Sequence, residues 1–248
     1  MTEAIWWPVA LGVLGAVFGS FIATVAIRWP AGRSALIGRS ACDGCGQTLS
    51  PLELVPLVSG IALRGRCRSC GGRIGLSHPA TELLGLGIGV VAGLVAPGWT
   101  AVAGAVFGWL LLAAGAVDLA AFRLPNAVTL TLAVSGVFTG AIGVPPPVFD
   151  RAIGGVLGFG ALWMVAAVYR MVRGRIGLGG GDAKLFGAIG LWLGWRALPP
   201  TLLIACLLGL GVVLVMVLSG RKVAATDRLP LGSLLAVGAF AMWIFAAS

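Results

Sequence analysis

Eight apolar stretches dominate the 248-residue chain and most constrain its fold. A helix needs about 20 apolar residues to cross a hydrocarbon core about 30 Å thick. Runs that approach this length predict membrane-spanning helices at residues 5–27, 80–96, 99–117, 127–144, 152–172, 183–198, 201–219 and 229–247. The sixth stretch is the weakest, because Lys184 and Arg196 enclose only eleven uncharged residues.

The composition supports a membrane protein and excludes other classes. Hydrophobic residues make up 59% of the chain and charged residues 10%, whereas soluble domains are about half apolar and about a quarter charged. Disorder would need more polar residues, and five cysteines are too few for a disulfide scaffold of this length. The net charge of +9 is spread thinly over apolar sequence, so we expect no nucleic-acid partner. The prediction is an all-α polytopic protein with about eight transmembrane helices in the lipid bilayer.

Positively charged residues predict the orientation, because cytoplasmic loops hold an excess of Lys and Arg. With eight alternating spans, fifteen of the seventeen Lys and Arg residues fall on one side, and Arg151 and Arg196 are the exceptions. The positive charges follow the first apolar stretch and Glu3 precedes it. This order indicates an uncleaved anchor rather than a signal peptide. Both termini are therefore expected outside.

Residues 28–79 form a polar insertion between the first helix, at 1–27, and the remaining seven helices, at 80–248. The insertion contains two Cys-x-x-Cys pairs separated by 21 residues, namely Cys42 with Cys45 and Cys67 with Cys70. This spacing lets four thiolates hold a tetrahedral Zn²⁺ in a closed structural site. Two disulfides or unrelated buried thiols are the alternatives, and a reducing cytoplasm disfavours disulfides. We expect a small cytoplasmic zinc-binding lobe.

Two of the eight acidic residues, Asp118 and Asp182, differ from the others in their surroundings. Asp118 ends an apolar run, and Asp182 follows a glycine-rich run at 177–181. The predicted topology places both near the inner surface of the bilayer, where ionisable side chains are costly and indicate function. Two carboxylates in one low-dielectric pocket share a proton, as in aspartic proteases. The alternative is that each caps a helix or pairs with Lys184 or Arg123.

Taken together, these motifs resemble the type IV prepilin peptidases, which are bifunctional leader peptidases and N-methyltransferases. The similarity extends over nearly the whole chain. It includes both cysteine pairs, Asp118 with Leu124-Pro125-Asn126, the glycine run with Asp182-Ala183-Lys184-Leu185, and Leu229-Pro230-Leu231-Gly232. Two departures are that Ala120 stands where relatives often carry a second acid, and that Leu52 and Leu54 replace the Trp and Asn that usually flank Glu53.

The resemblance implies a membrane aspartic endopeptidase of the bacterial inner membrane. Such enzymes remove the basic leader of prepilins and pseudopilins at the cytoplasmic face, cutting after a glycine. The implied catalytic pair is Asp118 and Asp182, and the implied active-site loop contains Gly179, Gly180, Gly181 and Lys184.

The resemblance also implies N-methylation of the new N-terminus with S-adenosylmethionine, a reaction that the cysteine lobe would serve. Glu53 and Glu82 are the candidate residues for this step. A peptidase without methyltransferase activity is one alternative. The alternative from another class is a proton- or cation-coupled transporter, although transporters usually place such charges near the bilayer midplane.

Overall fold

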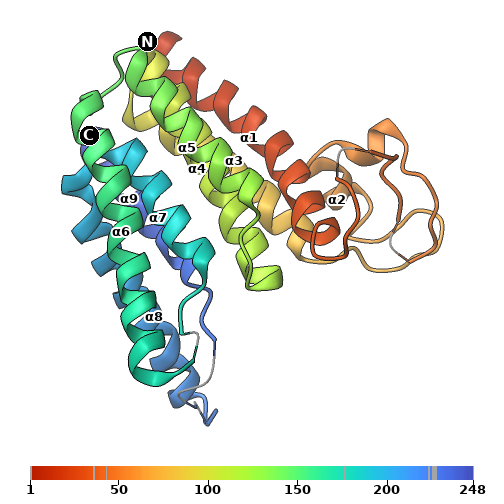
Figure 1. The fold of residues 1–248 in the computed structure, drawn as a ribbon. Coiled ribbons are helices and arrows are strands. Elements are labelled where there is room, and N and C mark those ends of the chain that lie inside the picture. The colour runs from red at the N-terminus through yellow and green to blue at the C-terminus, as the bar shows by residue number, and fades with distance from the viewer. Residues whose placement is uncertain are drawn as a thin grey trace. The chain divides into compact units, whose positions relative to one another are not determined.

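The computed structural model describes residues 2–35, 37–42, 44–175, 177–222, 224 and 228–247. Within these ranges the chain forms helices and two isolated β-bridges, and no strand (Figure 1). The helices are α1 (Thr2–Arg28), the 3-10 helix η1 (Pro51–Leu54), α2 (Val58–Ala62), α3 (Ser77–Val95), α4 (Gly98–Ala121), α5 (Asn126–Ala141), α6 (Val148–Arg173), α7 (Gly180–Leu193), the 3-10 helix η2 (Trp195–Ala197), α8 (Leu198–Leu218) and α9 (Leu231–Ala247). The predicted all-α class is confirmed.

Each of the eight predicted apolar stretches overlaps a long helix, although not always over its full length. Over the described ranges, five segments are long and apolar enough to cross a membrane by length and composition: Ile5–Arg28, Ser77–Val95, Gly98–Ala121, Val148–Arg173 and Trp195–Leu218. Two further helices, α5 and α9, are apolar but shorter, and α7 has 14 residues. The prediction of one helix over 183–198 is wrong at its C-terminal end. Gly194 adopts a φ of 77° that ends α7, and η2 and α8 follow.

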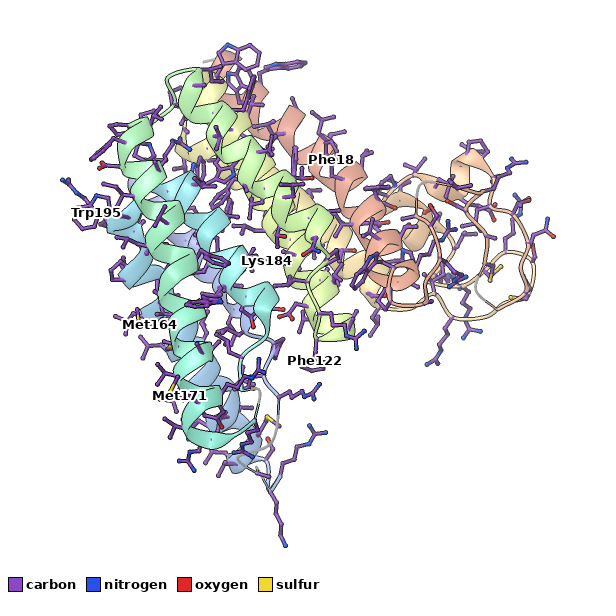
Figure 2. All side chains as sticks on the ribbon, in the orientation of Figure 1. Phe18, Phe122, Met164, Met171, Lys184 and Trp195 are labelled. Atoms are coloured by element: carbon purple, nitrogen blue, oxygen red, sulfur yellow. The ribbon has the colours of Figure 1, made fainter. Side chains whose placement is uncertain are left out.

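Large apolar side chains cover much of the helix surface. On α6, Met171 is 84% exposed and Met164 is 58% exposed, and both side chains point away from the helix bundle (Figure 2). Extensive apolar patches of this kind are rare on monomeric soluble proteins. They are expected where lipid rather than water surrounds the helices.

The chain divides into two compact units, Met1–Ala116 and Val117–Ser248. In the first unit α1 packs along α3, and the 28–79 insertion with α2 projects beyond the ends of these two helices (Figure 1). The contact depends on glycine, because a Cβ at Gly15 or Gly85 would clash with the backbone of the other helix. Small residues allow such close approach between membrane helices. Trp109 Nε1 also donates a hydrogen bond of 3.0 Å to Gly85 O.

In the second unit α7 is the central helix, with α5, α6 and α9 packed on it. Most of its residues from Ala183 to Trp192 are buried. Gly154 on α6 and Gly190 on α7 bring these helices into backbone contact, because a Cβ at either position would clash with the other. This packing fixes α7 and therefore the position of Asp182 near its beginning.

Arg151, one of the two exceptions to the predicted charge asymmetry, is buried rather than in an aqueous loop. Its side chain is 2% exposed. The guanidinium donates to carbonyl oxygens near the C-terminal ends of α5 and α7, including Gly136 O and Leu191 O, both at 2.9 Å. It also donates to Val144 O and Pro145 O at 2.9 Å. Arg151 therefore satisfies helix ends that would otherwise lack donors.

Candidate active site

Asp118 lies in the last turn of α4 and is 5% exposed. Its Oδ2 accepts hydrogen bonds from the backbone N–H of Ser233 at 2.9 Å and from Ser233 Oγ at 3.3 Å. Ser233 belongs to the first turn of α9. Because helix N-termini carry free N–H groups and a partial positive charge, this position favours a carboxylate. The alternative that Asp118 caps a helix is therefore correct as a description of its contacts.

The chain turns sharply after Asp118. Phe122 adopts a φ of 51°, which is uncommon for a bulky residue, and its N–H donates to Asp118 O at 2.8 Å. The turn ends α4 and directs Leu124 toward the start of α7, where a Cβ at Gly181 would lie 3.0 Å from Leu124 Cβ. The α4–α5 connection thus joins the end of α4, which carries Asp118, to the first turn of α7, which carries Asp182.

Asp182 is half-buried in the first turn of α7. Leu124 links its surroundings to those of Asp118, because a Cβ at Gly181 would lie 3.0 Å from Leu124 Cβ and a Cβ at Gly232 would lie 3.1 Å from Leu124 Cδ1 and 2.9 Å from Asp118 Oδ2. Among the described residues, Asp118 accepts from two donors of Ser233, whereas Asp182 has a backbone hydrogen-bond contact with Gly179 alone. The two acids therefore have unequal environments, as an acid–base pair requires.

The glycine run before Asp182 leaves space around the carboxylate. Gly179 is the N-cap of α7 with φ −70° and ψ 139°, and a Cβ there would lie 3.2 Å from Asp182 Oδ2. A Cβ at Gly180 would meet nothing within 4 Å, so this position faces open space. The prediction of a loop is wrong for three of its four residues, because Gly180, Gly181 and Lys184 belong to the start of α7 and Gly179 alone precedes it.

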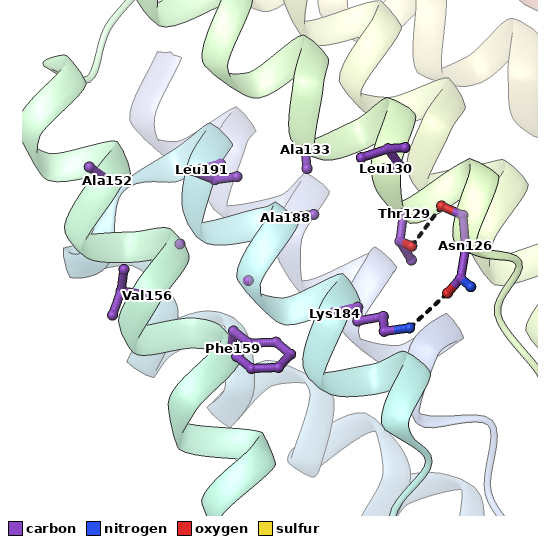
Figure 3. Close-up of a pocket in the computed structure, with 12 residues that line it drawn as sticks. Asn126, Thr129, Leu130, Ala133, Ala152, Val156, Phe159, Lys184, Ala188 and Leu191 are labelled. Carbon is purple, nitrogen blue, oxygen red and sulfur yellow. Dashed lines mark hydrogen bonds between the residues drawn. The ribbon is translucent and has the colours of Figure 1, made fainter.

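Lys184 does not pair with either aspartate through a contact recorded in the described residues. Its Nζ donates to Asn126 Oδ1 at 2.8 Å, across from α7 to the start of α5 (Figure 3). The alternative of a Lys184–Asp182 ion pair therefore receives no support. Asn126 belongs to the Leu124-Pro125-Asn126 motif, and its hydrogen bond with Lys184 joins residues 58 positions apart, which no local pattern predicts.

The four predicted cysteine ligands converge. The sulfur atoms of Cys42, Cys45, Cys67 and Cys70 all lie within 4.8 Å of one another, and Cys42 Sγ is 3.9 Å from Cys70 Sγ. Four sulfurs about 2.3 Å from a tetrahedral zinc ion lie about 3.8 Å apart. All four cysteines are free, which removes the disulfide alternative for this structure.

The two cysteine pairs adopt the same turn. Cys42 N donates to Gln47 O at 2.9 Å, and Cys67 N donates to Gly72 O at 2.8 Å. The glycine after each pair has positive φ, 71° at Gly46 and 68° at Gly71. Backbone N–H groups of Cys70 and Ser69 lower the pKa of the Cys67 thiol to about 7. Such donors stabilise the thiolate that a metal requires.

A cavity of about 770 Å³ lies in the first unit, between the 28–79 insertion and the adjoining ends of α1 and α3. Its wall contains both signs of charge, because Glu53, Glu82 and several arginines line it: Arg28, Arg64, Arg66, Arg68 and Arg73. The two carboxylates also have local contacts. Glu53 Oε2 accepts from Ser50 N at 2.7 Å, and Glu82 Oε2 accepts from Leu57 N at 2.8 Å.

The fold and these sites define a helical protein with membrane-type spans, an interacting pair of carboxylates and a four-cysteine lobe. Two family models match this chain: the Bacterial Peptidase A24 N-terminal domain over residues 13–95, and the Type IV leader peptidase family over residues 105–214. With the relatives described next, the chain belongs to the type IV leader peptidase family.

Proteins named prepilin leader peptidase/N-methyltransferase are similar to this chain. The one from Burkholderia pseudomallei (strain K96243) is 37% identical over 260 residues, which cover 94% of this chain and 84% of the relative. The one from Aeromonas salmonicida (strain A449) is 35% identical over 84% of this chain and 71% of the relative. The one from Klebsiella pneumoniae is 35% identical over 80% of this chain and 90% of the relative. No solved structure matches the chain.

Sequence reasoning missed the residues that hold Asp118. Ser233 and Gly232 lie 115 and 114 positions further along the chain, and no spacing rule links them to an acid in α4. A Cβ at Gly232 would lie 2.9 Å from Asp118 Oδ2. The motif Leu229-Pro230-Leu231-Gly232 was the available signal, because it marks the start of a helix whose N–H groups need an acceptor.

Proposed function

We propose that this protein is a membrane aspartic endopeptidase that removes the basic leader of prepilins or pseudopilins and then methylates the new N-terminus. The observation that carries the proposal is geometric: Leu124 packs against Gly181, which precedes Asp182, and against Gly232, where a Cβ would lie 2.9 Å from Asp118 Oδ2. Two acids that are far apart in the chain therefore share one site. Membership of the leader peptidase family and the names of the relatives supply the substrate class. Cleavage after a glycine is carried over from the family resemblance.

The unequal surroundings of the two acids suggest their roles. Asp118 accepts donors from the start of α9, so it is the carboxylate that carries the charge and removes a proton from water. Asp182 holds the shared proton and donates it to the scissile carbonyl oxygen as hydroxide adds to the carbon. When the tetrahedral diol collapses, Asp182 recovers its proton and Asp118 gives its proton to the leaving amine. Atoms and charges balance over the cycle.

We place the protein in the bacterial inner membrane with eight spans and both termini outside. Five segments meet the length and composition of a span, and α5, α7 and α9 would complete the set as short or tilted helices. The charge asymmetry supports a cytoplasmic position for the cysteine lobe and for both aspartates. The organisation would be a first helix at 1–27, a lobe at 28–79 and a peptidase core at 80–248.

The sulfur cluster fits a structural zinc ion held by Cys42, Cys45, Cys67 and Cys70. Four sulfur ligands complete a tetrahedral shell, so the ion would order the lobe and take no part in either reaction. Cys67 is the one buried side chain among the described residues of 28–79. A lobe with so little buried surface needs such a cross-link to hold one conformation.

Methyl transfer fits the cavity lined by Glu53 and Glu82. Its volume of about 770 Å³ is within the range of small-molecule sites. S-adenosylmethionine supplies the methyl group and carries charges of both signs, as the cavity wall does. Glu53 or Glu82 would accept the proton that the substrate amine loses, and the arginines would hold the donor's carboxylate. A peptidase without this second activity is the alternative.

The decisive experiment is co-expression with candidate prepilins followed by mass spectrometry of the pilin N-terminus. Wild type should yield leaderless, methylated product, whereas Asp118→Asn and Asp182→Asn should leave the precursor intact. Asp150→Asn is the matched control, because Asp150 is a helix-start aspartate that accepts from Trp195 Nε1 at 3.1 Å and lies outside the site. Normal processing by either site variant would exclude the carboxylate pair. Leaderless but unmethylated product would support the peptidase-only alternative.

A further inference from the structure

A second large cavity, of about 780 Å³, runs along α7 between α5 and α6 (Figure 3). Both α5 and α6 pack far more on α7 than on each other. The cavity is therefore a groove with α7 as its floor and the other two helices as its walls. Twelve residues line it: Asn126, Thr129, Leu130, Ala133, Ala152, Gly155, Val156, Phe159, Lys184, Gly187, Ala188 and Leu191.

The floor of the groove is narrow and closely packed, while its walls are apolar and uncovered. A Cβ at Gly187 would lie 3.0 Å from Phe159 Cβ and 3.1 Å from Gly155 O, so even a methyl group there would crowd α6. On the walls, Val156 is 73% exposed and Leu130 is 64% exposed. The groove can accept another apolar surface without rearrangement of its floor.

Charge selects the kind of segment that the groove can hold. Among its twelve described lining residues, Lys184 is the one charged side chain. Its ammonium has three donors, and one of them is used by Asn126. A cation at the end of an otherwise apolar groove repels a basic leader. It attracts carbonyl oxygens, which an extended peptide leaves without hydrogen-bond partners and which must be satisfied within a membrane.

We propose that this groove holds the apolar transmembrane helix that follows the cleavage site of the substrate. This inference rests on the proposed leader peptidase function. A helix about 10 Å across occupies roughly 850 Å³ in two turns, so the groove matches about two turns. Lys184 and Asn126 then meet the extended residues between that helix and the scissile bond.

Helix geometry fixes the path of the substrate. Asp182 and Lys184 are two residues apart on α7, so their side chains point about 200° apart around the helix axis. The groove therefore lies across α7 from Asp182, and the substrate must pass the N-terminus of α7. Crossing a helix about 10 Å wide takes about three extended residues at about 3.3 Å each. The groove-bound helix should begin at least about three residues after the cut.

A steric variant with a matched control tests the groove. Val156→Trp adds bulk to the wall, whereas Val165→Trp places the same side chain nine residues later, on the opposite face of α6, where Val165 is 58% exposed. Each variant is assayed with a full prepilin and with a short peptide that ends before the apolar helix. We expect Val156→Trp to lower the ratio of kcat/KM for the full substrate over the short peptide about tenfold, mainly through KM. Val165→Trp should keep the wild-type ratio.

Three results distinguish the possibilities. If both tryptophan variants keep the wild-type ratio of kcat/KM, the groove does not bind the substrate helix, although the peptidase proposal stands. If the wild type cleaves neither substrate, the proposed function itself fails. Leu130→Trp on the opposite wall repeats the test should Val156→Trp not fold. A photo-crosslinker at position 156 should capture the prepilin, and capture of phospholipid alone in the presence of prepilin would overturn the inference.

Discussion

Asp118 and Asp182 lie on helices, whereas the four cysteines lie in turns outside any helix. The two regions are therefore held in place by different interactions. The aspartates are positioned by packing against α9 and the α4–α5 connection. The cysteine lobe has one buried side chain, Cys67, among its described residues. Under the proposed function, we therefore expect proteolysis to depend on helix packing and methylation to depend on the metal that the four cysteines would hold.

Separating the two reactions gives the largest expected effect. Asp118→Asn or Asp182→Asn should lower prepilin cleavage by about 10³-fold or more, because an acid–base pair is lost. Methylation of a pilin that has already lost its leader should continue at close to the wild-type rate. Both rates are measured by mass spectrometry on purified enzyme. A joint loss of both reactions would mean that the two regions do not work independently.

A variant that crowds Asp118 without changing its charge tests whether helix packing positions this carboxylate. A Cβ at Gly232 would lie 2.9 Å from Asp118 Oδ2, so Gly232→Ala must displace either the carboxylate or the start of α9. Overpacking of this kind costs about 1–3 kcal/mol, and if that cost falls on the position of the carboxylate in the transition state, kcat/KM drops about 5- to 150-fold. Gly160→Ala on α6 is the control, because its Cβ would meet nothing within 4 Å. Equal activity of the two variants would contradict the role of α9.

Removing one of the four cysteines tests whether the lobe and the methylation reaction depend on a bound metal. Cys67→Ser should reduce bound zinc from one ion per chain to a small fraction, measured by elemental mass spectrometry, and should abolish methylation because the lobe loses its cross-link. We expect peptidase activity to fall less than about tenfold, since helix packing carries that site. Cys206→Ser is the matched control, because Cys206 is an exposed residue of α8 and is not one of the four clustered cysteines. Full zinc content in Cys67→Ser would rule out the four-sulfur site.

The helical class and the approximate positions of the eight long helices could be predicted from the sequence because apolar runs determine them directly, whereas the short helices η1, α2 and η2 were not predicted. The end of α7 could not. Apolar residues continue from Leu193 to Trp195, and the break comes from the positive φ of Gly194, which a residue-by-residue count of hydrophobicity does not register. Arg151 is a similar case, because its burial depends on carbonyl groups from two other helices.

The candidate site residues followed from their residue types and neighbours, and their catalytic assignment stays a prediction. The tertiary contacts around each of these residues could not be predicted from the sequence. The contact of Ser233 with Asp118 spans 115 positions, and that of Lys184 with Asn126 spans 58. Tertiary contacts of this length arise only when the helices pack. The cysteine cluster is the opposite case, since its two identical short turns are local and the spacing alone predicted them.

The smallest expected effect concerns Glu53, whose expected contribution to the stability of the lobe is separate from that of the metal. Hydrogen bonds from the Ser50 backbone N–H and side chain lower the pKa of the Glu53 carboxyl, and the charge of Arg68 adds to this. A lowered folded-state pKa stabilises the fold above the unfolded-state value of about 4.3 and loses that contribution as pH falls through the folded value. Glu53→Gln should therefore melt slightly below wild type at pH 7, with the difference shrinking toward zero as pH falls below about 4. Acid also protonates the cysteines and releases metal, so the two proteins are compared at each pH by calorimetry. A difference that grows at low pH would mean that the carboxylate is not the stabilising form.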